Sequence, residues 1–214
     1  MTHKLFNPDE QQLLADIMLH RRDVRGNRFL ADPIDDTVID TILQAAAMAP
    51  SVGFSQPWEF VMIRDSHIKQ QVAQSFAIEN QKAAHLFDDE KHALYSQLKL
   101  EGILEAPLNI AVFYKPSTGA VLGQNSMAET GEYSVVCAIQ NMWLMARALN
   151  VGLGWVSIIN PQTVKTILHA PADNKLVAYL CLGYVDEFYD QPELEKRQWE
   201  KRKQIESVVY QDRY

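Results

Sequence analysis

The chain has 214 residues, of which 47% are hydrophobic and 22% charged, so it is long enough for one sizeable core and is not a collagen, a disordered low-complexity chain or a coiled coil. Its 27 acidic and 20 basic residues give a formal charge of −7, which disfavours generic binding to nucleic acid or to an anionic membrane. No apolar run is long enough for a transmembrane helix, and the N-terminus lacks the apolar stretch of a signal peptide.

The sequence predicts one cytoplasmic domain over residues 1–214. No internal repeat and no Gly/Ser-rich or Pro-rich linker divides the chain. Its two cysteines, Cys137 and Cys181, lie in apolar runs, as buried thiols usually do. A reducing cytoplasm is the simplest interpretation of this cysteine content.

The first part of the chain predicts two helices and a strand. A helix is expected over residues 8–22, because Asn7 can cap it and Pro8 suits the first helical position. A second helix begins near residue 35 or 36 and must stop by Ala49, because a residue before proline disfavours the helical conformation. After a turn-rich loop, residues 58–63 are predicted to form a strand.

Residues 66–132 are expected to form a lid over a site. The stretch 66–104 is helical in pattern but poorly amphipathic, which indicates a long helix that covers something. Residues 108–114 predict a strand inside this region, and residues 116–132 predict a polar loop that contains glycine.

The last third predicts a buried helix, two strands and an arm. The helix over 132–149 is apolar on almost every side, so it should be buried within the domain or between subunits. Residues 153–159 and 176–185 predict strands, with a short helix between them. The charged tail 186–214 carries scattered apolar residues and is expected to be an arm that packs against another surface, such as a partner chain. This order predicts an α+β or a mixed α/β fold, of which we take the α+β fold, with a mixed central sheet flanked by helices, as the expectation.

Four arginines fall within eight residues: Arg21, Arg22, Arg25 and Arg28. Guanidinium groups bind phosphate through paired hydrogen bonds. A cationic helix end is the alternative interpretation, because it is favourable with the helix dipole. Asp23 lies inside the cluster and stays ionised there, so it either orients an arginine or accepts and donates protons.

Two further segments are candidate parts of a site. Residues 49–58 place small and polar residues between two prolines, which could present backbone N–H groups to a planar ligand or simply connect a helix to a strand. Glycines 152 and 154 precede an apolar strand and allow close approach of a ligand or of backbone, and Ser157 is the one hydroxyl in that run. No phosphate-binding glycine motif and no paired metal spacing is present, which disfavours metal catalysis and acyl transfer.

Together these segments resemble the flavin-dependent nitroreductase superfamily and, within it, the dimethylbenzimidazole synthase (BluB) family. Typical nitroreductases have Ser or Thr after the two arginines, whereas the dimethylbenzimidazole synthases have the aspartate found here at Asp23 and a serine at the position of Ser157. The matching segments cover most of the chain: RRDVR (21–25), APSVGFSQPW (49–58), LKLEGI (98–103), YSVVCAIQNMWLMARA (133–148), GLGWVSI (152–158) and LCLGYVDEFYDQPELE (180–195).

The resemblance implies an FMN-binding homodimer of nitroreductase-like fold, with its sites between the subunits and an exchanged C-terminal arm. It also implies that reduced FMN is the substrate and that Asp23 and Ser157 are catalytic. The residues that it implies for flavin binding are Arg21, Arg22, Asp23, Val24 and Arg25, Ser51 and Gly53 from the neighbouring subunit, Leu100 under the lid, Ser157, and Arg202 in the arm as a second phosphate ligand.

One stretch departs from the family pattern. The loop 122–132 usually carries an arginine after Leu-Gly and a Pro-Glu-Met triplet, and here Gln124 and residues 128–130 stand in their places. The departure falls on the part expected to close over the site and leaves Asp23 and Ser157 unchanged.

The reaction implied is the oxygen-dependent fragmentation of reduced FMN to 5,6-dimethylbenzimidazole, the lower ligand of vitamin B12, and erythrose 4-phosphate. A separate NAD(P)H:flavin reductase could supply the reduced FMN. One alternative is an NAD(P)H-dependent FMN nitro- or quinone reductase, which cycles its flavin by hydride transfer. A flavin-binding or storage protein is a third possibility, against which Asp23 argues, because storage needs no acid or base.

Overall fold

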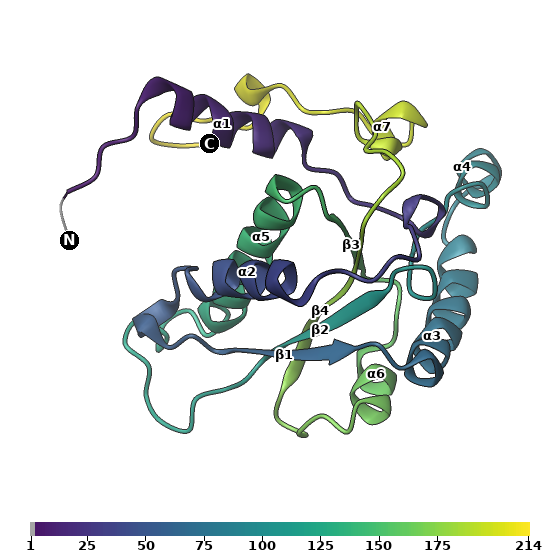
Figure 1. The fold of residues 1–214 in the computed structure, drawn as a ribbon, viewed down its shortest axis with the longest axis horizontal. Coiled ribbons are helices and arrows are strands. Elements are labelled where there is room, and N and C mark those ends of the chain that lie inside the picture. Colours follow the sequence, from purple (N-terminus) through teal and green to yellow (C-terminus); the bar gives the residue numbers. More distant parts are fainter. Residues whose placement is uncertain (1–2) are drawn as a thin grey trace.

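The computed structural model describes residues 3–214, apart from the side chain of Asp89. Four strands and seven helices follow one another along the chain (Figure 1). Their bounds are α1 (Pro8–His20), α2 (Asp36–Ala47), β1 (Trp58–Ile63), α3 (Ser66–Ala84), α4 (Asp89–Tyr95), β2 (Leu108–Tyr114), α5 (Thr130–Ala148), β3 (Gly152–Val156), α6 (Pro161–Ile167), β4 (Lys175–Gly183) and α7 (Glu193–Lys196), with short 3-10 turns at Gly26–Arg28, Val52–Phe54 and Ile205–Ser207.

The start of the chain forms as its capping residues predict. The Asn7 side chain accepts a hydrogen bond from the Glu10 amide at 2.9 Å, and the Glu10 carboxylate accepts one from the Asn7 amide at 2.9 Å. The helix ends at His20 rather than at residue 22, because Arg21 adopts an extended conformation. The strands β1 and β2 have the predicted bounds, and β3 and β4 differ from the prediction by one to three residues at each end.

The long helix expected over residues 66–104 is wrong in detail. The structure has two helices there, α3 and α4, followed by an irregular stretch. The break occurs where Asp88 caps a new helix by accepting a hydrogen bond from the Lys91 amide at 3.1 Å. A polar stretch with little apolar face has few packing contacts to keep one helix continuous across such a cap.

The central sheet has the strand order β1-β2-β4-β3, and all three pairings are antiparallel. The expectation of a mixed sheet is therefore wrong for these four strands, because a local sequence pattern does not determine the direction in which distant strands pair. In the part of the chain that the structure describes, parallel pairing is limited to one isolated bridge between Asp23 and Leu153. That bridge matters for the site, because it attaches the segment after α1 to the edge strand β3.

The sheet separates two cores. Alternate residues of β2 point to opposite faces, as the two-residue period of a strand requires. Ile110 and Val112 enter the core covered by α2 and α5, and Ala111 and Phe113 enter the core that α3 and α6 cover. Figure 1 shows α2 and α5 on one side of the strands and α6 on the other. This rigid sheet fixes the position of β3 and so of the segment that pairs with it.

Helices α1 and α5 carry apolar side chains that remain exposed. The helix α1 has no buried residue, and Leu13 and Leu19 are 61% and 60% exposed. Val136 and Tyr133 of α5 are also exposed. The helix predicted to be buried on all sides is thus only partly covered within one chain. No helix within residues 3–214 is both long and apolar enough to cross a bilayer.

Candidate active site

One pocket of about 200 Å³ lies where the end of α1, the segment 21–25, the lid and the C-terminal arm meet. The chain brings these parts together from three separate regions of the sequence, residues 18–25, 98–100 and 189–202. Six of the residues singled out from the sequence line this pocket: Arg21, Arg22, Asp23, Arg25, Leu100 and Arg202.

The segment 21–25 is held against the edge strand β3. The Val24 amide donates to the Leu153 carbonyl at 3.1 Å, and the Val24 side chain is buried. Gly154 permits this approach, since a Cβ atom there would lie 2.0 Å from the Val24 carbonyl oxygen. The arginine segment 21–25 and the glycine segment 152–154 therefore pack against each other, and Gly154 leaves the space that the Val24 backbone occupies.

Asp23 is fixed by strand β3 and by a neighbouring cation. Its Oδ1 accepts a hydrogen bond from the Trp155 amide at 3.0 Å, and its Oδ2 pairs with Arg25. One third of the side chain, 33%, remains exposed toward the pocket. Burial raises the pKa of Asp23 above its ordinary value, and the opposing effects of Arg25, the Trp155 amide and Arg21 do not cancel that rise. A carboxyl group with a raised pKa holds its proton more readily than an ordinary aspartate and is suited to both giving and taking a proton.

Arg25 links Asp23 to the lid. Its Nη1 donates to the Leu100 carbonyl at 3.1 Å and to the Trp155 carbonyl at 3.2 Å. The next residue, Gly26, donates its amide to the Glu101 carbonyl at 2.8 Å. The lid edge at residues 98–101 therefore runs directly beside the arginine segment, and this contact places Leu100 at the pocket.

Arg21 offers an unused donor. Its Nε is buried and has no hydrogen-bond partner within residues 3–214, and its guanidinium lies 5.0 Å from the centre of the Trp143 ring. A buried donor without a partner is costly. An anionic ligand in the pocket would satisfy it, so Arg21 fits a phosphate group.

Arg22 is engaged differently. Its guanidinium donates to four backbone carbonyls, including Leu19 at 2.7 Å, Tyr189 at 2.9 Å and Asp190. The side chain is only 8% exposed. Arg22 lines the pocket, but its hydrogen-bonding capacity is used to hold the C-terminal arm against the end of α1.

Four predicted residues lie outside this pocket, and one of them is Val24, whose side chain is buried. Ser51 accepts a hydrogen bond from the Gln56 amide at 3.0 Å, and Gly53 lines a different pocket of about 700 Å³ beside Leu122 and Gln124. Ser157 is exposed just beyond the end of β3. Within one chain, the structure therefore does not bring Ser51, Gly53 or Ser157 to the arginine pocket.

Eight of the residues that line the pocket were not predicted. Lys99 and Tyr189 are two of them. They fall inside the segments 98–103 and 180–195, whose similarity to the family pattern was the available signal. Lys99 pairs with Glu105 at 2.7 Å and with Glu101, so its charge is balanced within the lid. No group of three His, Cys, Asp or Glu side chains within the described residues is arranged to hold a metal ion.

Comparison with known proteins gives a consistent result. The model of the "Nitroreductase family" matches residues 18–184. The 5,6-dimethylbenzimidazole synthase of Rhodospirillum rubrum is 45% identical over 94% of this chain and 96% of its own, and that of Rhodobacter capsulatus is 38% identical over 92% and 95%. Among solved structures, a BluB-like flavoprotein from Clostridium difficile 630 superposes with a TM-score of 0.69 at 22% identity, over 94% of this chain and 99% of its own.

Proposed function

The chain belongs to the nitroreductase family, and from this membership, its similarity to dimethylbenzimidazole synthases and the geometry of its pocket we propose that it converts reduced FMN and O₂ into 5,6-dimethylbenzimidazole and erythrose 4-phosphate. The observation that carries this proposal is the position of Asp23. This carboxyl group has a raised pKa and lies among arginines in a pocket. A redox enzyme that only cycles its flavin by hydride transfer needs no such group there.

The phosphate of the substrate would be held by the arginines that have donors to spare. Arg21 has an unpartnered Nε, and Arg202 reaches the same pocket from the arm. Arg25 and the backbone at Val24 would contact the flavin beside them. Holding the phosphate fixes the ribityl chain, so that the bond to be cleaved keeps one orientation relative to the catalytic groups.

Protons would be moved by Asp23. The reaction breaks the C1′–C2′ bond of the ribityl chain, so that C1′ stays with the ring nitrogens in dimethylbenzimidazole, the other four carbons leave as erythrose 4-phosphate, and the pyrimidine part of the flavin leaves as a further fragment. Several proton transfers must therefore occur close together. The bound flavin supplies the electrons that reduce O₂. Asp23 keeps its Oδ1 on the Trp155 amide, which orients the carboxyl group, while Leu100 covers the site and Ser157 would donate a hydrogen bond to a ring nitrogen or oxygen.

The complete site requires a second copy of the chain. A pocket of about 200 Å³ is smaller than the 300–1,000 Å³ typical of ligand sites, so the arginine pocket can hold only part of a flavin nucleotide. The exposed apolar side chains of α1 and α5 supply a surface for a partner subunit. In such a homodimer, Ser51 and Gly53 of one subunit would contact the flavin of the other, and the part of the arm 186–214 that follows Arg202 would cross to the partner, since residues 189–202 line the pocket of their own chain.

The lid and the supply of substrate complete the proposal. The parts of residues 66–132 outside strand β2, which is buried in the sheet, would close over the flavin and exclude water, which otherwise diverts the reaction of reduced flavin with O₂. A separate NAD(P)H:flavin reductase would provide the reduced FMN. Both thiols of the chain are free, which fits a cytoplasmic location.

The test is to reduce FMN anaerobically with the protein, admit air, and measure dimethylbenzimidazole and erythrose 4-phosphate by mass spectrometry. The proposal requires both products and loss of flavin. Recovery of intact FMN, with steady NADPH oxidation when nitroaromatics are added, would assign the protein as a nitro- or quinone reductase instead. Tight FMN binding without any turnover would assign it as a storage protein.

A further inference from the structure

The C-terminal arm contacts the rest of the chain in several places, and the first of them lies just after β4. Strand-like contacts hold its first residues: Phe29 forms an isolated bridge with Val185, and the Asp186 amide donates to the Arg28 carbonyl at 3.1 Å. From residue 186 onward the arm leaves the sheet and returns over the pocket, which it lines with Tyr189, residues 192–194 and Arg202.

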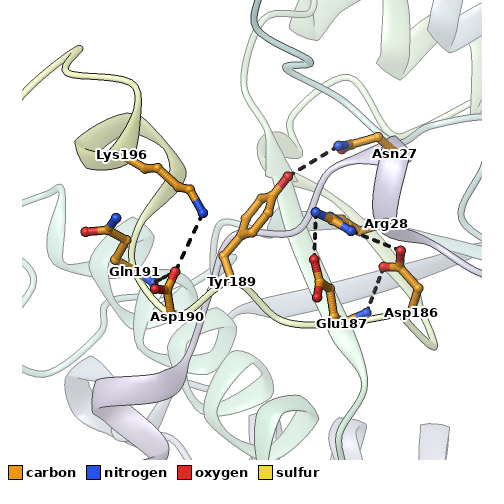
Figure 2. Close-up of polar contacts among 8 residues, drawn as sticks. All are labelled: Asn27, Arg28, Asp186, Glu187, Tyr189, Asp190, Gln191 and Lys196. Carbon is orange, nitrogen blue, oxygen red and sulfur yellow. Dashed lines mark hydrogen bonds and ion pairs between the residues drawn. The ribbon is translucent and has the colours of Figure 1, made fainter.

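Arg28 binds this part of the arm through the two terminal nitrogens and the face of its guanidinium group. Its Nη1 pairs with Asp186 at 3.0 Å, and its Nη2 pairs with Glu187 at 2.8 Å. Its guanidinium also lies 4.4 Å from the centre of the Tyr189 ring. Figure 2 shows Tyr189 between Arg28 on one side and Lys196 on the other, with Asn27 near its hydroxyl.

Arg22 holds the same stretch from the pocket side. It donates to the Tyr189 carbonyl at 2.9 Å and to the Asp190 carbonyl. Two different arginines therefore bind Tyr189: Arg28 contacts its ring, and Arg22 donates to its backbone carbonyl. Single exposed ion pairs contribute little, but here two ion pairs, a cation–aromatic contact and charged hydrogen bonds converge on five consecutive residues.

We propose that Arg28, together with Arg22, is a positioning residue: the two arginines clamp residues 186–190 and thereby set the arm, with Arg202, against the phosphate end of the pocket. The arginine cluster thus divides by role. Arg21, Arg25 and Arg202 face the bound FMN. Arg22 and Arg28 instead hold the arm that carries Arg202. Arg28 does not line the pocket, so its effect on binding passes through the arm. The inference rests on the proposed function for its choice of FMN as the ligand.

The clamp is tested with Arg28→Ala in the full-length protein. The matched control is Arg64→Ala, which removes a surface arginine paired with Asp36 at 3.2 Å, because neither of these residues lines the pocket. We expect Arg28→Ala to speed hydrogen–deuterium exchange in residues 186–202 and to raise the Kd for FMN on the order of tenfold, the loss expected for one charged contact to phosphate. Arg28→Lys, which keeps the charge and loses the forked geometry, should fall between wild type and Arg28→Ala.

A double variant separates positioning from general stability. If Arg28 acts by placing Arg202, then Arg28→Ala adds little to the Kd effect of Arg202→Ala, and the two changes are not additive. Additive effects on the Kd, or an arm whose exchange does not change in Arg28→Ala, would overturn the inference. These measurements use FMN binding and amide exchange, so they stand even if the wild type makes no dimethylbenzimidazole, a result that would count only against the proposed function.

Discussion

Gly154→Ala should damage both stability and catalysis, because it separates the two segments that form the site. The Cβ atom of alanine would lie 2.0 Å from the Val24 carbonyl oxygen, whereas real Cβ contacts essentially never fall below 3.0 Å. The two backbones must therefore move apart by about 1 Å, the difference between these distances. The atom that is struck belongs to the backbone, so no side-chain rotation relieves the clash.

The displacement affects the hydrogen bonds on either side of Gly154. The Val24 amide would leave the Leu153 carbonyl, and the Asp23 carboxylate would leave the Trp155 amide. Forced insertion of a methyl group into a packed site costs about 1–3 kcal/mol of unfolding free energy. For a chain of this size each 1 kcal/mol lowers Tm by about 2–4 °C, so we expect a loss of roughly 2–12 °C. A misplacement of about 1 Å can lower the rate about 100-fold.

Thermal unfolding and the rate of dimethylbenzimidazole formation measure the two effects. Gly119→Ala is the control, since a Cβ there would meet nothing within 4 Å. The control should match wild type in both assays. The reasoning would be refuted by a Gly154→Ala variant with unchanged Tm and product formation, or by a Gly119→Ala variant that is equally impaired.

Two further predictions concern ionisable groups. Burial raises the pKa of the Cys181 thiol, so under native conditions an aromatic disulfide reagent should label Cys137, which is partly exposed, and should reach Cys181 only after unfolding; rapid labelling of both thiols would contradict the packing described. Because the pKa of Asp23 is raised in the folded state, its contribution to stability is fully present below its unfolded pKa and is lost as the pH rises through the folded pKa. The Tm of wild type should therefore fall relative to that of Asp23→Asn as the pH is raised from 4 to 8, because the pH then rises above the pKa of about 3.9 that Asp has in the unfolded chain. A constant difference in Tm, or a change in the other direction, would show that the pairing with Arg25 outweighs burial.

The elements with clear caps and strong periodicity could be predicted from the sequence. Asn7 and Pro8 mark the start of α1, and the apolar runs of β1 and β2 give their bounds to the residue. The two-helix structure of the lid was not evident, because its polar sequence carries little periodic signal and the break depends on the cap at Asp88. Antiparallel pairing throughout the sheet depends on long-range topology, which a local pattern does not encode.

Much of the candidate site followed from residue type and motif. The arginine segment, Leu100 and Arg202 were each identified, although 177 positions separate Arg25 from Arg202 (202 minus 25), and all of them line one pocket. The engagement of Arg22 could not be predicted, since its partners at Tyr189 and Asp190 are backbone carbonyls, which every residue possesses. The roles assigned to Ser51 and Gly53 remain predictions that depend on a second subunit, and the role assigned to Ser157 also remains a prediction.

The central claim is that Asp23 moves protons for the fragmentation of reduced FMN. The most direct test compares wild type with Asp23→Asn, each saturated with reduced FMN and then exposed to O₂, by following dimethylbenzimidazole with mass spectrometry and FMN binding with fluorescence. The account predicts that Asp23→Asn binds FMN and forms essentially no dimethylbenzimidazole, returning intact oxidised flavin. Formation of dimethylbenzimidazole by Asp23→Asn at the wild-type rate would contradict it.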